Sequence, residues 1–358
     1  TAAGVQAVRS AMTFDKSMTK IKSLVGIAGD EVDRMSESVK DLAKDTGISA
    51  NEAGDALFFI TSAGLRGAEA MEVLEASMKA AKVGLGETKT VADLATSALN
   101  AYGLENLSAT EATDVMVSAV REGKLEASEL AQSMGRVLPI ASQMGVQFHE
   151  VGAAFASMSR TGTNAAEAST AIRGILVGLL KPTKQGEERL KEMNLSYADL
   201  RKQLKDEGLL SLLNTLKDNF QGNAEAQADV FGNTKALVGV MDLLGKNIDG
   251  TRKIFDSLTR SVGATSEAFE IDAQSSASEF DKAVVRLSTS LLEIGEVVLP
   301  IVASGLEMVA DVVNFFKLDG LRKEFDKTRD SAKELNKELS KVPVGADSPK
   351  MATTPTLD

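Results

Sequence analysis

Apolar side chains recur at alternating steps of four and three residues toward the C-terminal end of this sequence. The series comprises Phe280, Val284, Leu287, Leu291, Ile294, Val298, Ile301, Gly305, Met308, Val312 and Phe315. A mean spacing of 3.5 residues places these positions along one side of an α-helix, whereas a strand needs a spacing of two. The series therefore predicts a long helix that packs along one seam against a partner helix, in the same chain or in another copy.

The remaining sequence also favours helices. Aromatic residues make up 4% of the 358 residues and tryptophan is absent, while alanine, leucine, methionine, lysine and glutamate fill long stretches. These side chains lose little rotamer freedom in a helix, whereas strands favour aromatic and β-branched residues. A second series at steps of four and three comprises Ala7, Ala11, Phe14, Met18, Ile21 and Val25. We therefore predict an all-α fold.

Glycines divide residues 28–182 into short segments. They stand at Gly47, Gly64, Gly103, Gly123, Gly145 and Gly162. Ser49 with Glu52, and Ser108 with Glu111, have the spacing of a capping box, in which the two residues satisfy free amides at a helix start. These signals predict short helices joined by tight turns.

An internal repeat with an offset of 98 residues runs through the same region. It aligns Gly47 with Gly145, Glu52 with Glu150, Gly54 with Gly152, Gly64 with Gly162, and residues 68–70 with 166–168. Repeated units of cap, helix, glycine and helix predict two similar helical hairpins that bury their faces against neighbours.

These patterns together predict a multi-helix bundle of short helices with tandem hairpin repeats, followed by long amphipathic and coiled-coil helices. The heptad pattern resumes after Leu318 among mixed charges, and prolines and threonines mark the final residues as a flexible tail. The expected divisions are an initial helix (1–27), a tandem helical-hairpin core module (28–182), a second helical region (183–270), long amphipathic and heptad helices (271–342) and the tail (343–358).

The sequence lacks the residues that several kinds of catalytic and metal site require. Cysteine is absent and His149 is the only histidine, so disulfides, a thiolate nucleophile, a histidine metal cluster and a histidine-based triad all lack components. We predict no enzymatic activity, no cofactor and no metal site. The net charge of −11 also argues against stable, sequence-specific nucleic-acid binding, because such binding depends on lysine and arginine displacing counterions.

Residues 297–316 form the most apolar window, close to the roughly 20 residues of a membrane-spanning helix. Glu307 and Asp311 interrupt it, and each carboxylate would cost about 2.5–3.5 kcal/mol at the bilayer centre, which disfavours a solitary span. The favoured interpretation is a core helix in a bundle or oligomer. In the alternative, several copies insert together with a polar stripe lining a pore, and both can hold at different stages.

Two sets of site residues follow from this helix. The candidate oligomer or membrane face comprises Leu287, Leu291, Ile294, Val298, Ile301, Val302, Val309, Val312, Phe315 and Phe316. The candidate pore lining or polar seam comprises Ser304, Glu307, Asp311 and Asn314.

The order of motifs resembles the core region of the phage tail tape measure family. After the helix from Phe14 to Val25, the similar segments are LAKDTGISANEAGDALFFITSAG (42–64), LAQSMGRVLPIASQMGV (130–146), FASMSRTGTNAAEASTAIRGIL (155–176) and VFGNTKALVGVMDLL (230–244). Each motif is a simple alanine and glycine pattern, and the specificity lies in their order and spacing.

The resemblance implies a virion protein that is assembled in the host cytoplasm and occupies the tail lumen. It implies that the protein templates polymerisation of the tail tube, sets tail length, and leaves ahead of the DNA, with residues 297–316 entering the host inner membrane as a conduit. The implied partners are further copies in a trimer or hexamer, the tail tube protein, tail assembly chaperones and tail tip or baseplate hub proteins. The frequent glycine stops predict a globular module of a longer tape measure, with the spacer partly outside it.

Two other functional classes remain open at this point. A membrane-active, pore-forming helical protein would use the same amphipathic helix as its main feature. A cytoplasmic coiled-coil adaptor would bind through the charged repeat after Leu318. Neither alternative requires the repeat at offset 98.

Overall fold

A computed structural model describes residues 2–232, 234–244 and 248–303, and within these ranges the chain contains helices and no strand. The first half comprises α1 (Ala2–Lys20), the π-helical turn η1 (Ile21–Val25), α2 (Gly29–Thr46), α3 (Ala50–Ser62), α4 (Gly67–Ala80), the π-helical turn η2 (Ala81–Leu85), α5 (Thr88–Tyr102), α6 (Ala109–Glu122), α7 (Ala127–Met134) and α8 (Leu138–Gln143). The second half comprises α9 (Phe148–Arg160), α10 (Ala165–Leu180), α11 (Lys184–Glu192), α12 (Tyr197–Phe220), α13 (Ala224–Phe231), α14 (Thr234–Leu244), α15 (Ile248–Leu258), α16 (Ala264–Ala273) and α17 (Ser276–Ala303). The all-α prediction is confirmed. The predicted domain divisions stay a prediction.

Local capping explains where many of these helices begin and end. Ser108 and Glu111 form the full capping box at the start of α6, and the Ser49 side chain accepts a hydrogen bond from the Glu52 amide at the start of α3. Gly47 ends α2 with a φ of 77°, in the left-handed region that costs glycine little. Such signals lie within a few residues of the boundary, which is why the sequence could predict them.

The predicted repeat is confirmed by the helix boundaries. α3 and α9 both begin and end 98 residues apart, and α4 and α10 begin 98 residues apart. Gly64 and Gly162, which lie between the helices of each hairpin, have φ values of 106° and 100°. The same turn therefore joins both hairpins.

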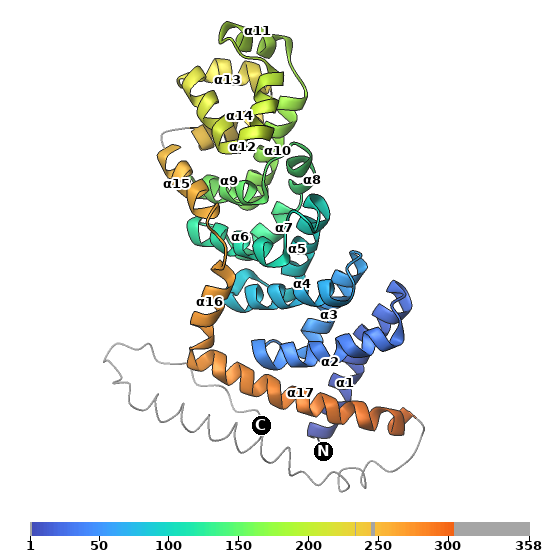
Figure 1. The fold of residues 1–358 in the computed structure, drawn as a ribbon. Coiled ribbons are helices and arrows are strands. Elements are labelled where there is room, and N and C mark those ends of the chain that lie inside the picture. Colours follow the sequence, from blue (N-terminus) through green and yellow to red (C-terminus); the bar gives the residue numbers. More distant parts are fainter. Residues whose placement is uncertain (1, 233, 245–247, 304–358) are drawn as a thin grey trace, which may run out of the picture.

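The helices form an elongated stack (Figure 1). α1, α2 and α17 lie at one end, α3–α10 follow in layers, and α11–α14 lie at the other end. After α14 the chain reverses: α15 packs on α9 and α6, α16 packs on α6 and α4, and α17 packs on α1 and α2. α15 and α16 thus run back along one side of the stack, and α17 lies across the end where the chain begins (Figure 1).

Small residues allow the helices of the stack to approach closely. A Cβ atom added to Gly54 would lie 3.3 Å from the Phe14 ring of α1, and one added to Gly152 would lie 2.9 Å from Leu258 Cδ2 of α15. These glycines are equivalent in the repeat, so each hairpin presents a glycine where a helix from elsewhere in the chain crosses it. One continuous apolar core extends from Phe14 to Leu292.

Candidate interaction site around helix α17

Helix α17 lies across α1 and α2 at one end of the stack (Figure 1). Its inward side buries Val285, Thr289 and Leu292, which are 8%, 1% and 2% exposed. Gly295 faces α1, where an added Cβ would press against the Ala7 carbonyl and lie 2.8 Å from Ala11 Cβ. The two helices therefore meet at backbone contact distance, which only a glycine permits here.

Ion pairs line the other edge of this contact. Lys40 Nζ lies 3.0 Å from Glu296 Oε2, and Lys44 Nζ lies 3.0 Å from Glu293 Oε1. Near the start of α17, Asp281 lies 2.7 Å from Lys82 Nζ of η2. We call these three pairs the latch. They join the early helices to α17 across 199 to 256 residues of sequence.

The two latch lysines of α2 stay charged. Burial lowers the pKa of Lys40, but its hydrogen bonds and charge interactions with Glu37 and Glu296 more than offset burial, so the pKa is raised above its ordinary value. Burial also lowers the pKa of Lys44, and Glu293 and Asp41 together raise it above the ordinary value. Lys40 and Lys44 are therefore charged at neutral pH.

The predicted apolar seam lies beside the buried side of α17 and not on it. At 100° per residue, Val284 and Leu291 lie 80–120° around the helix from Val285 and Leu292, the residues buried against α1 and α2. Phe280 and Val284 are 41% and 43% exposed. Among the seam residues with described side chains, Leu287, Leu291 and Ile294 are partly exposed, and only Val298, which is 9% exposed, is buried. From 280 to 294, the seam thus lacks a full partner within the described part of the chain.

The other predicted site residues are described only in part or not at all. Ile301 and Val302 lie on the last turn of α17, and their side chains are outside the description. Ser304, Glu307, Val309, Asp311, Val312, Asn314, Phe315 and Phe316 lie outside the described residues. None of the helices in the described ranges is both long enough and apolar enough to cross a membrane.

A buried carboxylate, Glu150, links the second hairpin to α12. Glu150, which is 6% exposed, accepts hydrogen bonds from the amides of Gln147 (3.2 Å) and Leu209 (2.7 Å). Gly208, with φ of 88°, breaks α12 at that point and frees the Leu209 amide. Burial raises the pKa of the Glu150 carboxyl, although these backbone hydrogen bonds act in the opposite direction.

Glu52, the equivalent residue in the first hairpin, has a similar role. Its carboxylate accepts hydrogen bonds from the Thr88 amide (3.2 Å) and hydroxyl (2.6 Å) at the start of α5. Each repeat therefore uses the third residue of its first helix to cap a helix far along the chain. In the sequence, the capping-box spacing identified Glu52 and the repeat aligned Glu150 with it, but neither signal showed these distant partners.

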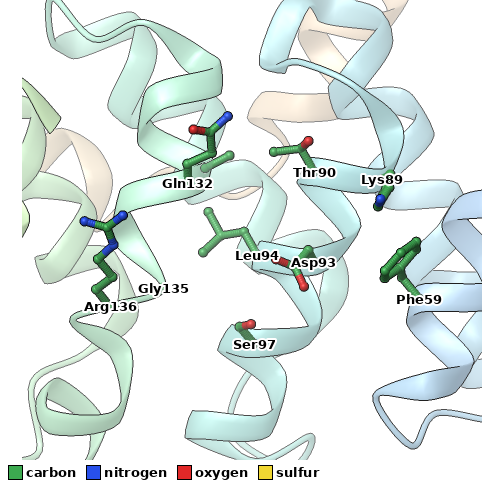
Figure 2. A pocket seen from close by; sticks show the side chains of 10 residues that line it. Phe59, Lys89, Thr90, Asp93, Leu94, Ser97, Gln132, Gly135 and Arg136 are labelled. Atoms are coloured by element: carbon green, nitrogen blue, oxygen red, sulfur yellow. The ribbon is translucent and has the colours of Figure 1, made fainter. Parts of the chain in front are cut away.

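A shallow cavity of about 450 Å³ lies between α3, α5 and α7 (Figure 2). Its lining comprises Phe59, Lys89, Thr90, Asp93, Leu94, Ser97, Ala131, Gln132, Gly135 and Arg136. Lys89 Nζ lies 4.1 Å from the centre of the Phe59 ring, a cation–π contact that explains this charge structurally. The lining has a serine and an aspartate but no histidine to act as a base between them. In the described part of the chain, no cluster of three or more histidine, cysteine, aspartate or glutamate residues could hold a metal ion.

Comparison with known families decides the identity of the chain. A model of phage-related minor tail proteins matches residues 36–234, more than half of its length. The chain belongs to the phage-related minor tail protein family. The match covers both hairpin repeats and α11–α13 of this minor tail protein.

Three tape measure proteins align with most of this minor tail protein. The tape measure protein of Pneumococcus phage Dp-1 is 25% identical over 85% of the chain. The probable tape measure proteins of Clostridium phage phiCD119 and Escherichia phage P2 are 24% and 20% identical over 74% and 76% of the chain. The chain spans 26%, 29% and 34% of the lengths of these three relatives. No solved structure is significantly similar to it. The resemblance to tape measure proteins is thus confirmed.

Proposed function

We propose that this chain is a helical module of a tail tape measure protein, which templates tail tube assembly and so sets tail length. The alignment with tape measure proteins from three phages, over 74–85% of the chain, carries the proposal. The module would assemble in the host cytoplasm with the tail tube protein, tail assembly chaperones and tail tip or baseplate hub proteins. It would then occupy the lumen of the tail and leave it during genome ejection.

Within this proposal, the folded stack is not the ruler itself. An α-helix advances about 1.5 Å per residue, so a rod of all 358 residues would span roughly 540 Å. Many helices of the stack instead lie across its long axis (Figure 1), so the folded module contributes far less length per residue. We therefore assign length measurement to an extended spacer, which includes the heptad segment after Leu318.

Tail length in virions tests this assignment. Four additional heptads after Leu339 should lengthen the tail by about 42 Å, because 28 helical residues at 1.5 Å each add to the rod. The same insertion between Glu105 and Asn106, in the exposed connection between α5 and α6, should leave tail length unchanged. Tails measured by electron microscopy that respond equally to both insertions, or to neither, would contradict the proposal.

The outward seam of α17 supports self-association of the module. Apolar residues that recur every 3.5 residues allow a helix to form a coiled coil with a second helix. The partly exposed Leu287, Leu291 and Ile294 follow this spacing. The pattern continues beyond the described residues to Phe315. We therefore propose a second copy of this chain as the occupant of the seam, within a trimer or hexamer.

Light scattering on the whole chain tests self-association. The Leu287→Glu, Leu291→Glu double variant should reduce the particle mass to that of one chain, while Ser288→Glu, at an exposed position of the same helix, should not. Circular dichroism checks that each variant keeps its helical content. A wild-type chain that stays monomeric at every concentration would refute the proposed seam.

Membrane insertion during ejection is the final part of the proposal. It is supported by the separation of polar and apolar positions in residues 297–316, which lets several copies line a wet pore with Ser304, Glu307, Asp311 and Asn314. The whole chain should release dye from anionic liposomes, and Val309→Asp should abolish release whereas Ser340→Ala, outside residues 297–316, should not. Intact liposomes at high protein concentration would exclude the conduit.

A further inference from the structure

We infer that α17 is a detachable strap, which the latch holds against α1 and α2 and which separates as a unit while the rest of the stack stays folded. The inference does not depend on the proposed function, because it rests on the contacts of α17 alone.

The apolar part of the α17 contact is small. Among its described side chains, α17 buries three large apolar residues: Val285, Leu292 and Val298. α9 is half as long and buries Phe148, Val151, Phe155 and Met158. Since the hydrophobic contribution follows the apolar area removed from water, residues 276–298 of α17 are held less firmly per residue than α9.

Two buried hydroxyls weaken the contact further. Ser278 and Thr289 are each 1% exposed, and neither hydroxyl oxygen has a hydrogen-bond partner among the described residues. A buried polar atom without a partner favours the state in which water can reach it. Separation of α17 would return both hydroxyls to water.

The latch supplies the specific part of the contact. Its three carboxylates, on Glu296, Glu293 and Asp281, have side chains that are 31%, 42% and 54% exposed, so water and salt reach the pairs. Ion pairs in such positions weaken as the screening length falls from about 10 Å at 0.1 M salt to about 3 Å at 1 M. The contact of α17 with the stack is therefore sensitive to salt.

Each α2 lysine of the latch has a second carboxylate ready on its own helix. Lys40 Nζ lies 2.7 Å from Glu37 Oε1, and Lys44 Nζ lies 3.5 Å from Asp41 Oδ1. Removing the partner of a buried charge such as Lys40, which is 4% exposed, is costly when no counter-charge remains. Because Glu37 and Asp41 remain after separation, loss of α17 leaves neither lysine unpaired.

The boundary of the detachable unit lies before α17. Asp114, fully buried on α6, accepts hydrogen bonds from the amides of Gly263 (2.6 Å) and Thr265 (2.8 Å), which ties the start of α16 to the stack. Residues 274 and 275 then join α16 to α17. Separation of α17 therefore stops at this joint.

Hydrogen exchange measured by mass spectrometry on the whole chain tests the strap. The Glu293→Gln, Glu296→Gln variant removes two latch charges with little change in shape, and should speed amide exchange in residues 276–303 at least tenfold while residues 148–180 stay unchanged. Raising the salt from about 0.05 M to 1 M should have the same effect on the wild type and a smaller one on the variant. The matched control is Glu270→Gln, Glu279→Gln, which removes two exposed charges from α16 and α17 outside the latch.

A variant that changes no charge tests the separation of α17 independently. Gly295→Leu should separate α17 through its clash with Ala7 and Ala11, and its exchange should not respond to salt. If residues 276–303 and 148–180 accelerate together in any of these experiments, α17 unfolds only with the whole stack and the inference is wrong. The same conclusion follows if α17 exchanges as slowly as α9 in every variant and at every salt concentration.

Discussion

Glu150 and Glu52 occupy the same position in the two repeats but differ in burial, so their replacement by alanine compares one interaction in two environments. Glu150 is 6% exposed and caps the buried Leu209 amide, whereas Glu52 is exposed. Glu150→Ala leaves a buried amide without a partner and removes a helix cap, which together should cost about 2–4 kcal/mol of unfolding free energy. Glu52→Ala opens Thr88 to water and should cost about 0.5–1 kcal/mol.

Two measurements check this difference. Urea denaturation followed by far-ultraviolet circular dichroism gives the unfolding free energies, provided that the dependence on urea keeps its slope. Hydrogen exchange at Leu209 and Leu210 should accelerate in Glu150→Ala and stay unchanged in Glu52→Ala. Equal losses for the two variants, or a larger loss for Glu52→Ala, would refute the argument that burial decides the value of this cap.

The pH dependence of Glu150 adds an independent check with a defined sign. Because burial raises its pKa in the folded state above the ordinary 4.5, the folded state holds the proton more tightly than the unfolded state does. The stability associated with this group is therefore present below pH 4.5 and falls as the pH rises through the folded-state pKa. Glu150→Gln should remove this fall, so its stability relative to the wild type should increase over that window. A constant difference between the two proteins would contradict the assignment.

Three further outcomes are expected. Asp114→Ala should cost about 1–3 kcal/mol and speed exchange at the Gly263 amide, since it leaves that amide without its buried acceptor. Gly152→Val should lower the unfolding free energy by about 1–3 kcal/mol, measured by urea titration, because its side chain overlaps Leu258. Burial lowers the pKa of His149 below 6.5, so thermal melts should show stability that is lost as the pH falls below 6.5, and His149→Gln should flatten that dependence.

The predictable parts of the fold depended on signals close together in the sequence. Glycine stops and capping residues such as Ser108 act within one turn of a helix end, so the boundaries followed from chemistry visible in a few residues. The offset of 98 residues was likewise visible, because both hairpins place Gly64 or Gly162 at the same turn. The sequence therefore predicted the two hairpins but not which helices pack against them.

The inward side of α17 could not be predicted, because its residues do not form an apolar series. Val285, Thr289, Leu292 and Glu296 lie along it, and half of them are polar. The apolar series that starts at Phe280 predicted a seam on another side of α17, but it did not specify which helix packs there. The lysine partner of Glu296 lies 256 residues away, and no local pattern connects two residues at that separation.

The position of the latch determines how the module would respond to tension. α1 and α17 contact each other at one end of the stack (Figure 1), although nearly the whole described chain separates them. Force applied between these two helices therefore loads the α17 contact before it reaches the apolar core of α3–α10. The α17 contact resists force less than this core does, because the carboxylates of the latch are partly exposed while the core excludes water. Tension from the C-terminal side should thus free α17, with its apolar seam, before any hairpin opens.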